Sequence, residues 1–215
     1  MKHPNIIKII CHDIGRHLGC YGVKSINSNA IDTLAKNGIL FKNSFATSPG
    51  CSPSRAAIAT GMYPHNTGVL GLAHAHFGWS LDKKINHIAK YFSKNGYTSI
   101  LFGLQHVTYH EKTLGFNKIF PERPADQVLR NITKIIDNKI FKKPFYAEVN
   151  FFEPHRPFDY GGIKPDKSKG VYIPKYIPKN IYSRREFAEM QGAIKKMDNT
   201  VFKIINLLKK KNLYE

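Results

Sequence analysis

The sequence has little cysteine, few acidic residues and no long apolar run, and each shortage narrows what the chain can be. Three of its 215 residues are cysteines, at positions 11, 20 and 51, and no two of them form a C-x-x-C pair. An odd number without paired spacing argues against a disulfide framework or a zinc knuckle and favours reduced thiols. The apolar stretches are far too short to cross a bilayer, so no membrane anchor is predicted.

The N-terminal stretch MKHPNIIKIICHDIG does not have the shape of a signal peptide. Its apolar run is brief, and His12 and Asp13 follow at once. We therefore expect a cytoplasmic protein. With 42% hydrophobic and 12% aromatic residues and no internal repeat, residues 1–215 are predicted to form one globular domain.

The shortage of acidic residues leaves a formal charge of +18, from 33 Lys and Arg against 15 Asp and Glu. Such a balance raises nucleic-acid binding as a candidate function. The lysines are scattered, however, and the main basic run is Lys209 to Lys211. We therefore keep a nucleic-acid binder as a minor alternative and infer a positive field that attracts an anionic substrate.

Apolar periodicity predicts an α/β fold, with a largely parallel sheet sandwiched by helices, because helices and strands alternate along the chain. A Gly-, Pro- and Lys-rich stretch at 159–182 is predicted to be a long surface loop. Strands are expected at 5–11, 39–46, 97–103 and 144–152, and a loop followed by a helix at 51–61. Further helices are expected at 29–38, 80–96, 128–138 and 183–211, the last amphipathic and the helix at 80–96 capped by Ser80.

Candidate catalytic side chains follow three of the predicted strands. His12 and Asp13 come after the first, His106 after the third and His155 after the fourth. Open α/β sheets place their sites at the carboxyl ends of the strands, so several polar groups there point to one site. His3, His87 and His110, which lie in a terminus, a helix and a loop, are not expected in it.

The stretch CSPSRAAIATG, residues 51–61, supplies a fourth candidate. Ser52 suits an N-cap, Pro53 the first helical position and Gly61 a helix stop. Cys51 then lies at the positive end of the helix dipole, with Arg55 one turn further in. Local chemistry alone leaves two interpretations open: an ordinary capped helix after a buried cysteine, or a site for an anion.

The longer motif, C-x-P-S-R followed by a helix and T-G, resembles the signature of the sulfatase family, within the alkaline-phosphatase-like superfamily. Cys51, Pro53, Arg55 and Gly61 all stand in register with it. The resemblance extends to PNIIKIICHDIGRHLGCYG, FYAEVNFFEPHRPF and AIKKMDNTVFKIINLLKKKNLYE, and so covers essentially the whole chain.

The resemblance implies that a formylglycine-generating enzyme oxidises Cys51 to formylglycine. One oxygen of its hydrate would bind a divalent cation, and the other would attack the sulfur of a sulfate ester, so that the alcohol leaves and sulfate is then expelled. Arg55 would hold the anionic centre. The implied activity is that of a sulfuric-ester hydrolase acting on a sulfated sugar or glycan.

The family pattern also assigns roles to the strand-end residues. Asp13 matches a ligand of Ca²⁺ or, as a second choice, Mg²⁺, and the modified Cys51 is a further ligand. His12 stands where most members have a second aspartate, so it is a candidate metal ligand of a less suitable kind or a sulfate contact. His106 matches the histidine of the family's G-K-x-H motif, and His155 matches a sulfate contact or leaving-group acid.

Two departures from the family pattern limit these expectations. Leu104 replaces the lysine of G-K-x-H, which removes one sulfate-binding cation. Sulfatases also continue into a strand with an Asp followed by Asn or His, whereas this sequence ends at Glu215, so we expect the incomplete N-terminal part of a sulfatase. The alternatives are a hydrolase of phosphate or phosphonate esters and an inactive, sulfatase-like remnant or binding protein.

Overall fold

The computed structural model describes residues 3–74, 76, 78–138 and 144–214. It divides the chain into two compact units. Unit 1 comprises residues 1–10, 44–123 and 131–150, and unit 2 comprises residues 11–43, 124–130 and 151–215. No helix among the described residues is both long enough and apolar enough to span a membrane.

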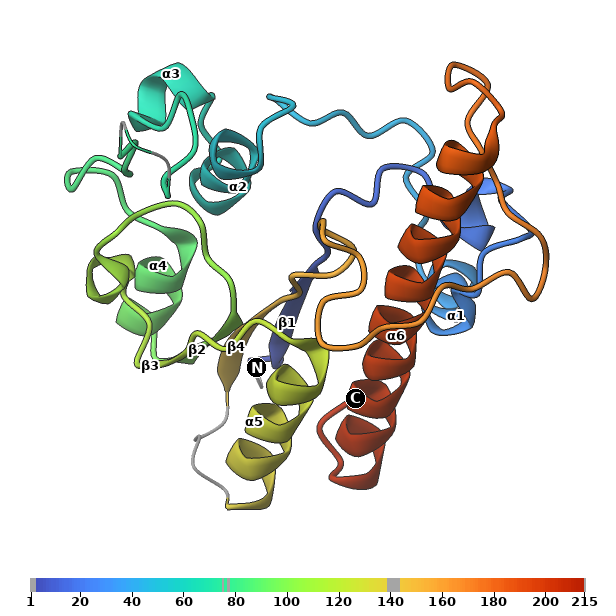
Figure 1. The fold of residues 1–215 in the computed structure, drawn as a ribbon. Coiled ribbons are helices and arrows are strands. Elements are labelled where there is room, and N and C mark those ends of the chain that lie inside the picture. The colour runs from blue at the N-terminus through green and yellow to red at the C-terminus, as the bar shows by residue number, and fades with distance from the viewer. Residues whose placement is uncertain (1–2, 75, 77, 139–143, 215) are drawn as a thin grey trace. The chain divides into compact units, whose positions relative to one another are not determined.

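A four-stranded sheet in the order β1-β4-β2-β3 forms the centre of unit 1 (Figure 1). Its strands are β1 (Ile6–Ile10), β2 (Thr98–Gly103), β3 (Lys118–Phe120) and β4 (Phe145–Asn150). Every pairing is parallel, and β4 is buried along its whole length. The predicted α/β class with a parallel sheet is confirmed, and β3 is a short strand that the sequence did not predict.

The other elements of unit 1 are helices on either side of β2 in the chain. They are α2 (Cys51–Thr60), α3 (Pro64–Thr67), α4 (Ile88–Lys94) and the 3-10 turn η2 (Glu111–Leu114). Helix α5 (Ala125–Asp137) begins in unit 2 and continues in unit 1. A small core of Ala56, Val69, Leu81, Val107 and Leu114 joins α2 to the loop after β2.

The predicted helix at 80–96 is wrong in its first half, because α4 begins only at Ile88. Ser80 is not its cap: the Ser80 hydroxyl bonds the Thr108 hydroxyl, and the His87 ring accepts the capping bond from the Ala89 N–H. The Leu81 N–H donates to the carbonyl of Val107. These long-range bonds hold residues 80–87 in an irregular path that overrides their helical pattern.

The strand predicted at 39–46 does not form. The side chains of Ile39, Phe41 and Phe45 are 83%, 69% and 88% exposed, and the described residues provide no neighbouring strand for this segment. A segment rich in large apolar residues forms a strand only where a partner strand supplies hydrogen bonds, so the local composition alone is not sufficient here.

Helix α6 (Ile181–Lys210) organises unit 2 and includes the helix predicted at 183–211. Its buried stripe contains Met190, Ile194, Met197, Val201, Ile204 and Leu208, which makes the helix amphipathic as predicted. Helix α1 (Asn29–Asn37) packs on α6, and the Asp198 carboxylate accepts bonds from the Ala30 and Ile31 N–H groups at 3.0 and 2.9 Å. Asp198 therefore does for α1 what an N-cap side chain does in other helices. The 3-10 turn η1 (Gly19–Tyr21) precedes α1.

The long loop predicted at 159–182 ends at Asn180, because α6 begins at Ile181, and α6 holds the irregular residues 159–180 by specific bonds. The Gln191 amide donates to the carbonyls of Asp166 and Gly170, both at 2.9 Å, and its oxygen accepts from the Tyr172 N–H at 2.9 Å. At Gly192 the backbone of the loop comes so close that a Cβ would lie 2.1 Å from the Lys164 oxygen. Only glycine allows this approach.

Candidate active site

Cys51 is the first residue of α2, so it lies at the positive end of a helix as predicted, although the sequence placed it just before the N-cap. The predicted N-cap is wrong by two residues, because Gly50 and not Ser52 precedes the helix. The Ser52 hydroxyl is fully buried and accepts a bond from the Ala73 N–H at 3.0 Å instead. Ser52 therefore anchors the start of α2 to the segment that follows α3.

His106 faces Cys51 from the loop after β2. Its Nδ1 lies 3.7 Å from the Cys51 Sγ, and the residue is 9% exposed. His106 adopts the left-handed conformation, with a φ of 57°. The Gln105 amide oxygen fixes this turn by accepting bonds from the Val107 and Thr108 N–H groups at 2.6 and 3.1 Å. Left-handed backbone in a non-glycine residue is uncommon and is often found at functional sites.

Arg55 is 6% exposed and lies on the same side of α2 as the loop after β2. Its Nη1 donates to the carbonyl oxygen of Leu104 at 3.3 Å. Leu104 occupies the position where the sulfatase pattern has a lysine. Its backbone carbonyl is the group that accepts this bond from the guanidinium. The buried guanidinium keeps a positive charge next to the loop that carries His106, as an anion site requires.

A cavity of about 230 Å³ adjoins His106 in unit 1. His74, whose ring stacks on His106 with centroids 4.3 Å apart, lines it together with Tyr109, Glu111 and Arg123. Tyr109 is 57% exposed, and Arg123 forms no ion pair with a carboxylate of the described residues. The cavity thus combines aromatic rings, a cation and a carboxylate beside the candidate catalytic histidine.

In unit 2, His12, Asp13 and His155 form one cluster, in which one donor atom from each residue lies within 4.8 Å of the others. His12 Nδ1 is 3.0 Å from Asp13 Oδ1, and His155 Nε2 is 3.7 Å from Asp13 Oδ2. His12 is 2% exposed, whereas the Asp13 and His155 side chains are 56% and 36% exposed. Asp13, like His106, has a left-handed backbone, with a φ of 46°.

Glu153 supports this cluster and was missed by the sequence reasoning. Its carbonyl accepts a bond from the His12 N–H at 3.2 Å, and its side chain accepts one from the Ala125 N–H, at the start of α5, at 3.0 Å. Burial raises the pKa of the Glu153 carboxyl. A carboxylate two residues before His155 was the available signal, and Glu153 connects the chain around His12 and His155 to the start of α5.

The sequence predicts one cleft for two sets of residues. The first set is Cys51, Arg55 and His106, and the second is His12, Asp13 and His155. Each set is assembled within its own unit. Their common cleft stays a prediction. Of the histidines expected elsewhere, His3 contacts the Tyr97 ring, His110 precedes η2 and His87 caps α4.

His87 belongs instead to a buried charged cluster around Glu148, in the middle of β4. The Glu148 carboxylate lies 2.7 Å from Lys8 Nζ and 3.7 Å from His87 Nε2, and it accepts the Tyr146 hydroxyl bond at 2.5 Å. Burial lowers the pKa of His87 to about 4. Burial alone would raise the pKa of Glu148, but the adjacent Lys8 ammonium and the hydrogen bonds hold it below its ordinary value.

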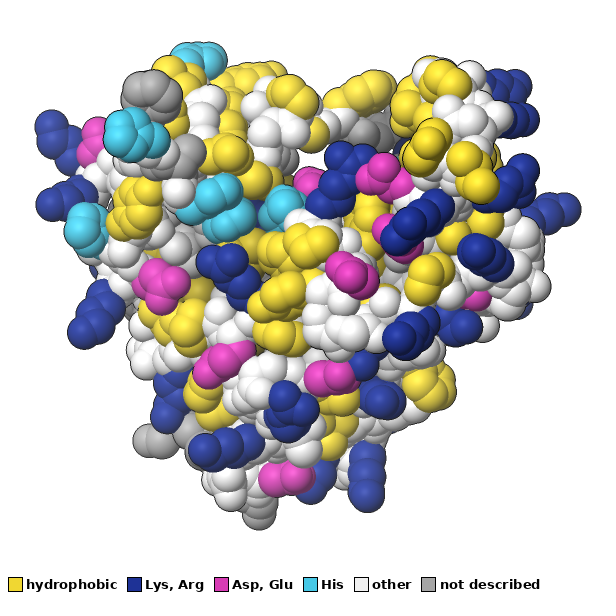
Figure 2. All heavy atoms as spheres, in the orientation of Figure 1, with side chains coloured by type: hydrophobic (Ala, Val, Ile, Leu, Met, Phe, Trp, Pro, Cys, Tyr) yellow, Lys and Arg dark blue, Asp and Glu magenta, His cyan; other side chains and the backbone are white. Residues whose placement is uncertain are grey.

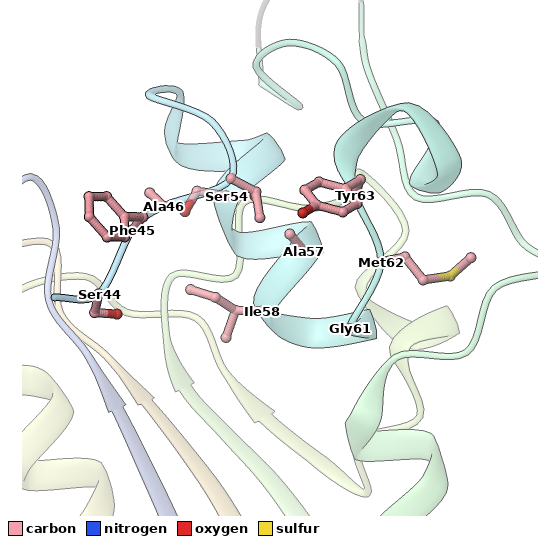
Figure 3. A pocket seen from close by; sticks show the side chains of 10 residues that line it. Ser44, Phe45, Ala46, Ser54, Ala57, Ile58, Gly61, Met62 and Tyr63 are labelled. Carbon is pink, nitrogen blue, oxygen red and sulfur yellow. The ribbon is translucent and has the colours of Figure 1, made fainter. Parts of the chain in front are cut away.

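A groove of about 550 Å³ runs along another face of α2 (Figure 3). Its walls are mostly apolar and include Phe45, Ala57, Ile58, Met62 and Tyr63, and it contains none of the predicted site residues. Over the face shown in Figure 2, Lys and Arg side chains are spread among other residues and do not gather into one patch.

Comparison with known proteins decides the family. The sulfatase family's sequence profile matches residues 4–215. This chain belongs to the sulfatase family. The N-sulphoglucosamine sulphohydrolase of Homo sapiens is 27% identical over 95% of the chain, and an ulvan-active sulfatase of Formosa agariphila is 32% identical over 83%. The alignments cover 47% and 35% of those two proteins, so this sulfatase chain spans less than half the length of either.

Solved structures show the same fold. Ps i-CgsB, determined in complex with a neocarrahexaose, matches the whole sulfatase chain with a TM-score of 0.74 at 23% identity. A phosphonate monoester hydrolase of Agrobacterium radiobacter matches 99% of it with a TM-score of 0.75 at 19% identity. The chain covers 56% and 60% of these two proteins. The alkaline-phosphatase-like fold, in incomplete form, is thereby confirmed.

The donor atoms of the His12–Asp13–His155 cluster are a poor match for Ca²⁺. Calcium takes about six to eight oxygen ligands, whereas the cluster offers one carboxylate and two imidazoles. Asp13 itself suits a divalent cation. The sequence-based assignment of a Ca²⁺ or Mg²⁺ site to Asp13, His12 and the modified Cys51 stays a prediction.

Proposed function

We propose that the protein to which these residues belong hydrolyses sulfate esters on sugars or glycans, starting from a formylglycine made from Cys51. The observation that carries the proposal is the position of Cys51, at the first residue of α2 with its Sγ 3.7 Å from His106 Nδ1. Membership of the sulfatase family supports the same reaction. A formylglycine at this position would supply a hydrated aldehyde as the nucleophile.

The chain's own residues account for anion binding. The positive end of α2 and the buried Arg55 guanidinium would together bind the sulfate oxygens. His106 is placed to exchange a proton with the group on residue 51. His155, at the end of β4 in the chain, is proposed as a sulfate contact or as the acid for the leaving alcohol, and Asp13 as a ligand of a divalent cation.

The cavity beside His106 supports a sugar as the leaving group. The exposed Tyr109 ring offers a face for a pyranose, and Glu111 can accept bonds from sugar hydroxyls. Arg123 would pair with a second anionic group on the same sugar. Named relatives that act on sulfated glycans, such as the ulvan-active sulfatase, are in keeping with this substrate class.

Hydrolysis of a phosphonate ester is the second candidate, because the fold is shared with a phosphonate monoester hydrolase. The test is turnover by the protein produced from its complete reading frame together with a formylglycine-generating enzyme. We expect hydrolysis of 4-nitrophenyl sulfate to exceed that of 4-nitrophenyl phosphate and a phenyl phosphonate, and to be lost in Cys51→Ala. Faster hydrolysis of the phosphonate would support the second candidate, and no turnover of any ester would support a binding protein.

A further inference from the structure

We propose that the His12–Asp13–His155 cluster is a site for a transition metal and prefers Zn²⁺ to Ca²⁺. This inference takes Asp13 as a metal ligand, as the proposed function does, and it assigns His155 to the metal in place of the sulfate contact or acid proposed above. It concerns the identity of the metal and does not depend on which ester is hydrolysed.

The chemical types of the donors carry the first step. Two imidazole nitrogens and one carboxylate oxygen are ligands that Zn²⁺ binds well, in sites that keep a fourth position for water or substrate. Ca²⁺ depends on several oxygen ligands with more than one negative charge, and the cluster provides a single carboxylate. His12 decides the preference between Zn²⁺ and Ca²⁺, because an aspartate at position 12 would give the cluster two neighbouring carboxylates.

The distances carry the second step. Ligands at about 2.0–2.1 Å in a tetrahedron lie about 3.3 Å from one another. Asp13 Oδ1 is 3.0 Å from His12 Nδ1, and Asp13 Oδ2 is 3.7 Å from His155 Nε2. The two separations involve different oxygens of Asp13 and lie on either side of the tetrahedral value. One donor atom from each of the three residues lies within 4.8 Å of the others, so side-chain rotations could bring the three donors onto one Zn²⁺ ion.

The surroundings of the two rings carry the third step. His155 Nδ1 lies within hydrogen-bonding distance of the Arg156 carbonyl, so a proton on Nδ1 leaves the Nε2 lone pair directed to the Asp13 side. This is the arrangement that orients metal-binding histidines in proteins. The centroid of the Phe152 ring lies 6.2 Å from that of the His12 ring and 4.9 Å from that of the His155 ring, so Phe152 limits the movement of both rings.

The test is metal binding by the 215-residue chain in a Cys51→Ser background, which removes the thiol of the candidate active site as a competing ligand. Isothermal titration with ZnCl₂ and CaCl₂ gives both affinities. We expect one Zn²⁺ to bind about 100-fold more tightly than Ca²⁺. His155→Ala and His12→Asp are expected to weaken Zn²⁺ binding by at least about tenfold, since even changes around the ligands cost that much.

His12→Asp is also expected to strengthen Ca²⁺ binding, and His65→Ala, which changes a histidine of α3 in unit 1, is the matched control and should alter neither affinity. Co²⁺ substituted for Zn²⁺ should give the absorption spectrum of a tetrahedral site without a thiolate charge-transfer band. This spectrum should be lost in His155→Ala, a change at a partly exposed side chain. Tighter binding of Ca²⁺ than Zn²⁺, or Zn²⁺ binding unchanged in His155→Ala, would overturn the proposal. No sulfate ester is present, so the test does not depend on the proposed reaction at Cys51; zinc binding through His155 would replace the acid or sulfate-contact role proposed for that residue.

Discussion

Two clusters of unit 1 contain a histidine beside a reactive or charged partner, and they differ in what surrounds them. The Glu148 cluster lies within the sheet, and its four members, Lys8, His87, Tyr146 and Glu148, face one another. Cys51 and His106 lie at a helix start and a strand end, next to a cavity, with His106 in a left-handed turn. The comparison teaches that a buried, mutually paired histidine stabilises the fold, whereas a strand-end histidine beside a cavity is available for chemistry.

The largest effect expected from this comparison is on turnover. In the complete, active protein, His106→Ala and His155→Ala should each lower kcat by about 10²- to 10⁴-fold, because each removes a proton carrier or a sulfate contact. His87→Asn keeps a capping side chain for α4 and should leave kcat within about threefold. Steady-state kinetics with 4-nitrophenyl sulfate measures all three. Loss of turnover in His87→Asn but not in the other two variants would mean that the Glu148 cluster takes part in catalysis and the Cys51–His106 pair does not.

The next effect is on the free energy of unfolding. Here a substitution in the Glu148 cluster should matter more than one at Cys51. Glu148→Ala leaves the Lys8 ammonium without its partner and should lower the free energy of unfolding by about 3 kcal/mol. Cys51→Ser, by contrast, changes a half-buried side chain in a loose contact and should cost less than about 1 kcal/mol. Urea denaturation followed by circular dichroism gives both values. An equal decrease in the free energy of unfolding in the two variants would mean that the Glu148 cluster does not stabilise the fold more than Cys51 does.

The Glu148 cluster should also make the stability depend on pH. The pKa of His87 is lowered from 6.5 to about 4 by burial, so the unfolded chain binds a proton there more readily than the folded one. Stability is therefore complete above pH 6.5 and falls as the pH is lowered toward 4, by about 2 kcal/mol between pH 7 and pH 5. The lowered pKa of Glu148 adds a further loss at still lower pH. In His87→Asn the loss between pH 7 and pH 5 should shrink, and an unchanged pH profile would argue against this origin.

The smallest effect concerns the apolar groove on the other face of α2 (Figure 3). Ile58 is 51% exposed there, beside Phe45 at 88%. Ile58→Ser should change the free energy of unfolding by no more than about 0.5 kcal/mol and should reduce aggregation, because large exposed apolar patches promote association. Light scattering during storage measures the second effect. Aggregation that is equal in Ile58→Ser and the unchanged chain would show that the groove is not its cause.

The sequence predicted the parts of the fold and site that depend on local pattern. The apolar run that forms β1 and the buried stripe of α6 were found from their apolar pattern, although the residues of β1 are only partly buried. Cys51 was found because its motif is continuous in the chain. The strand at 39–46 and the first half of the helix at 80–96 failed because distant partners decide those segments. Glu153, Gln105 and His74 were missed because their roles depend on contacts that form only in the folded chain.

The account depends most on Cys51 as the precursor of the nucleophile, and the chemical state of residue 51 tests this most directly. The 215-residue chain is produced with a formylglycine-generating enzyme, digested with protease and analysed by mass spectrometry, with Cys20 as the internal control. The account predicts an aldehyde at residue 51, confirmed by reaction with a hydrazide probe, while Cys20 stays a thiol. An unmodified thiol at residue 51, under conditions in which a known sulfatase peptide is fully converted, would contradict it.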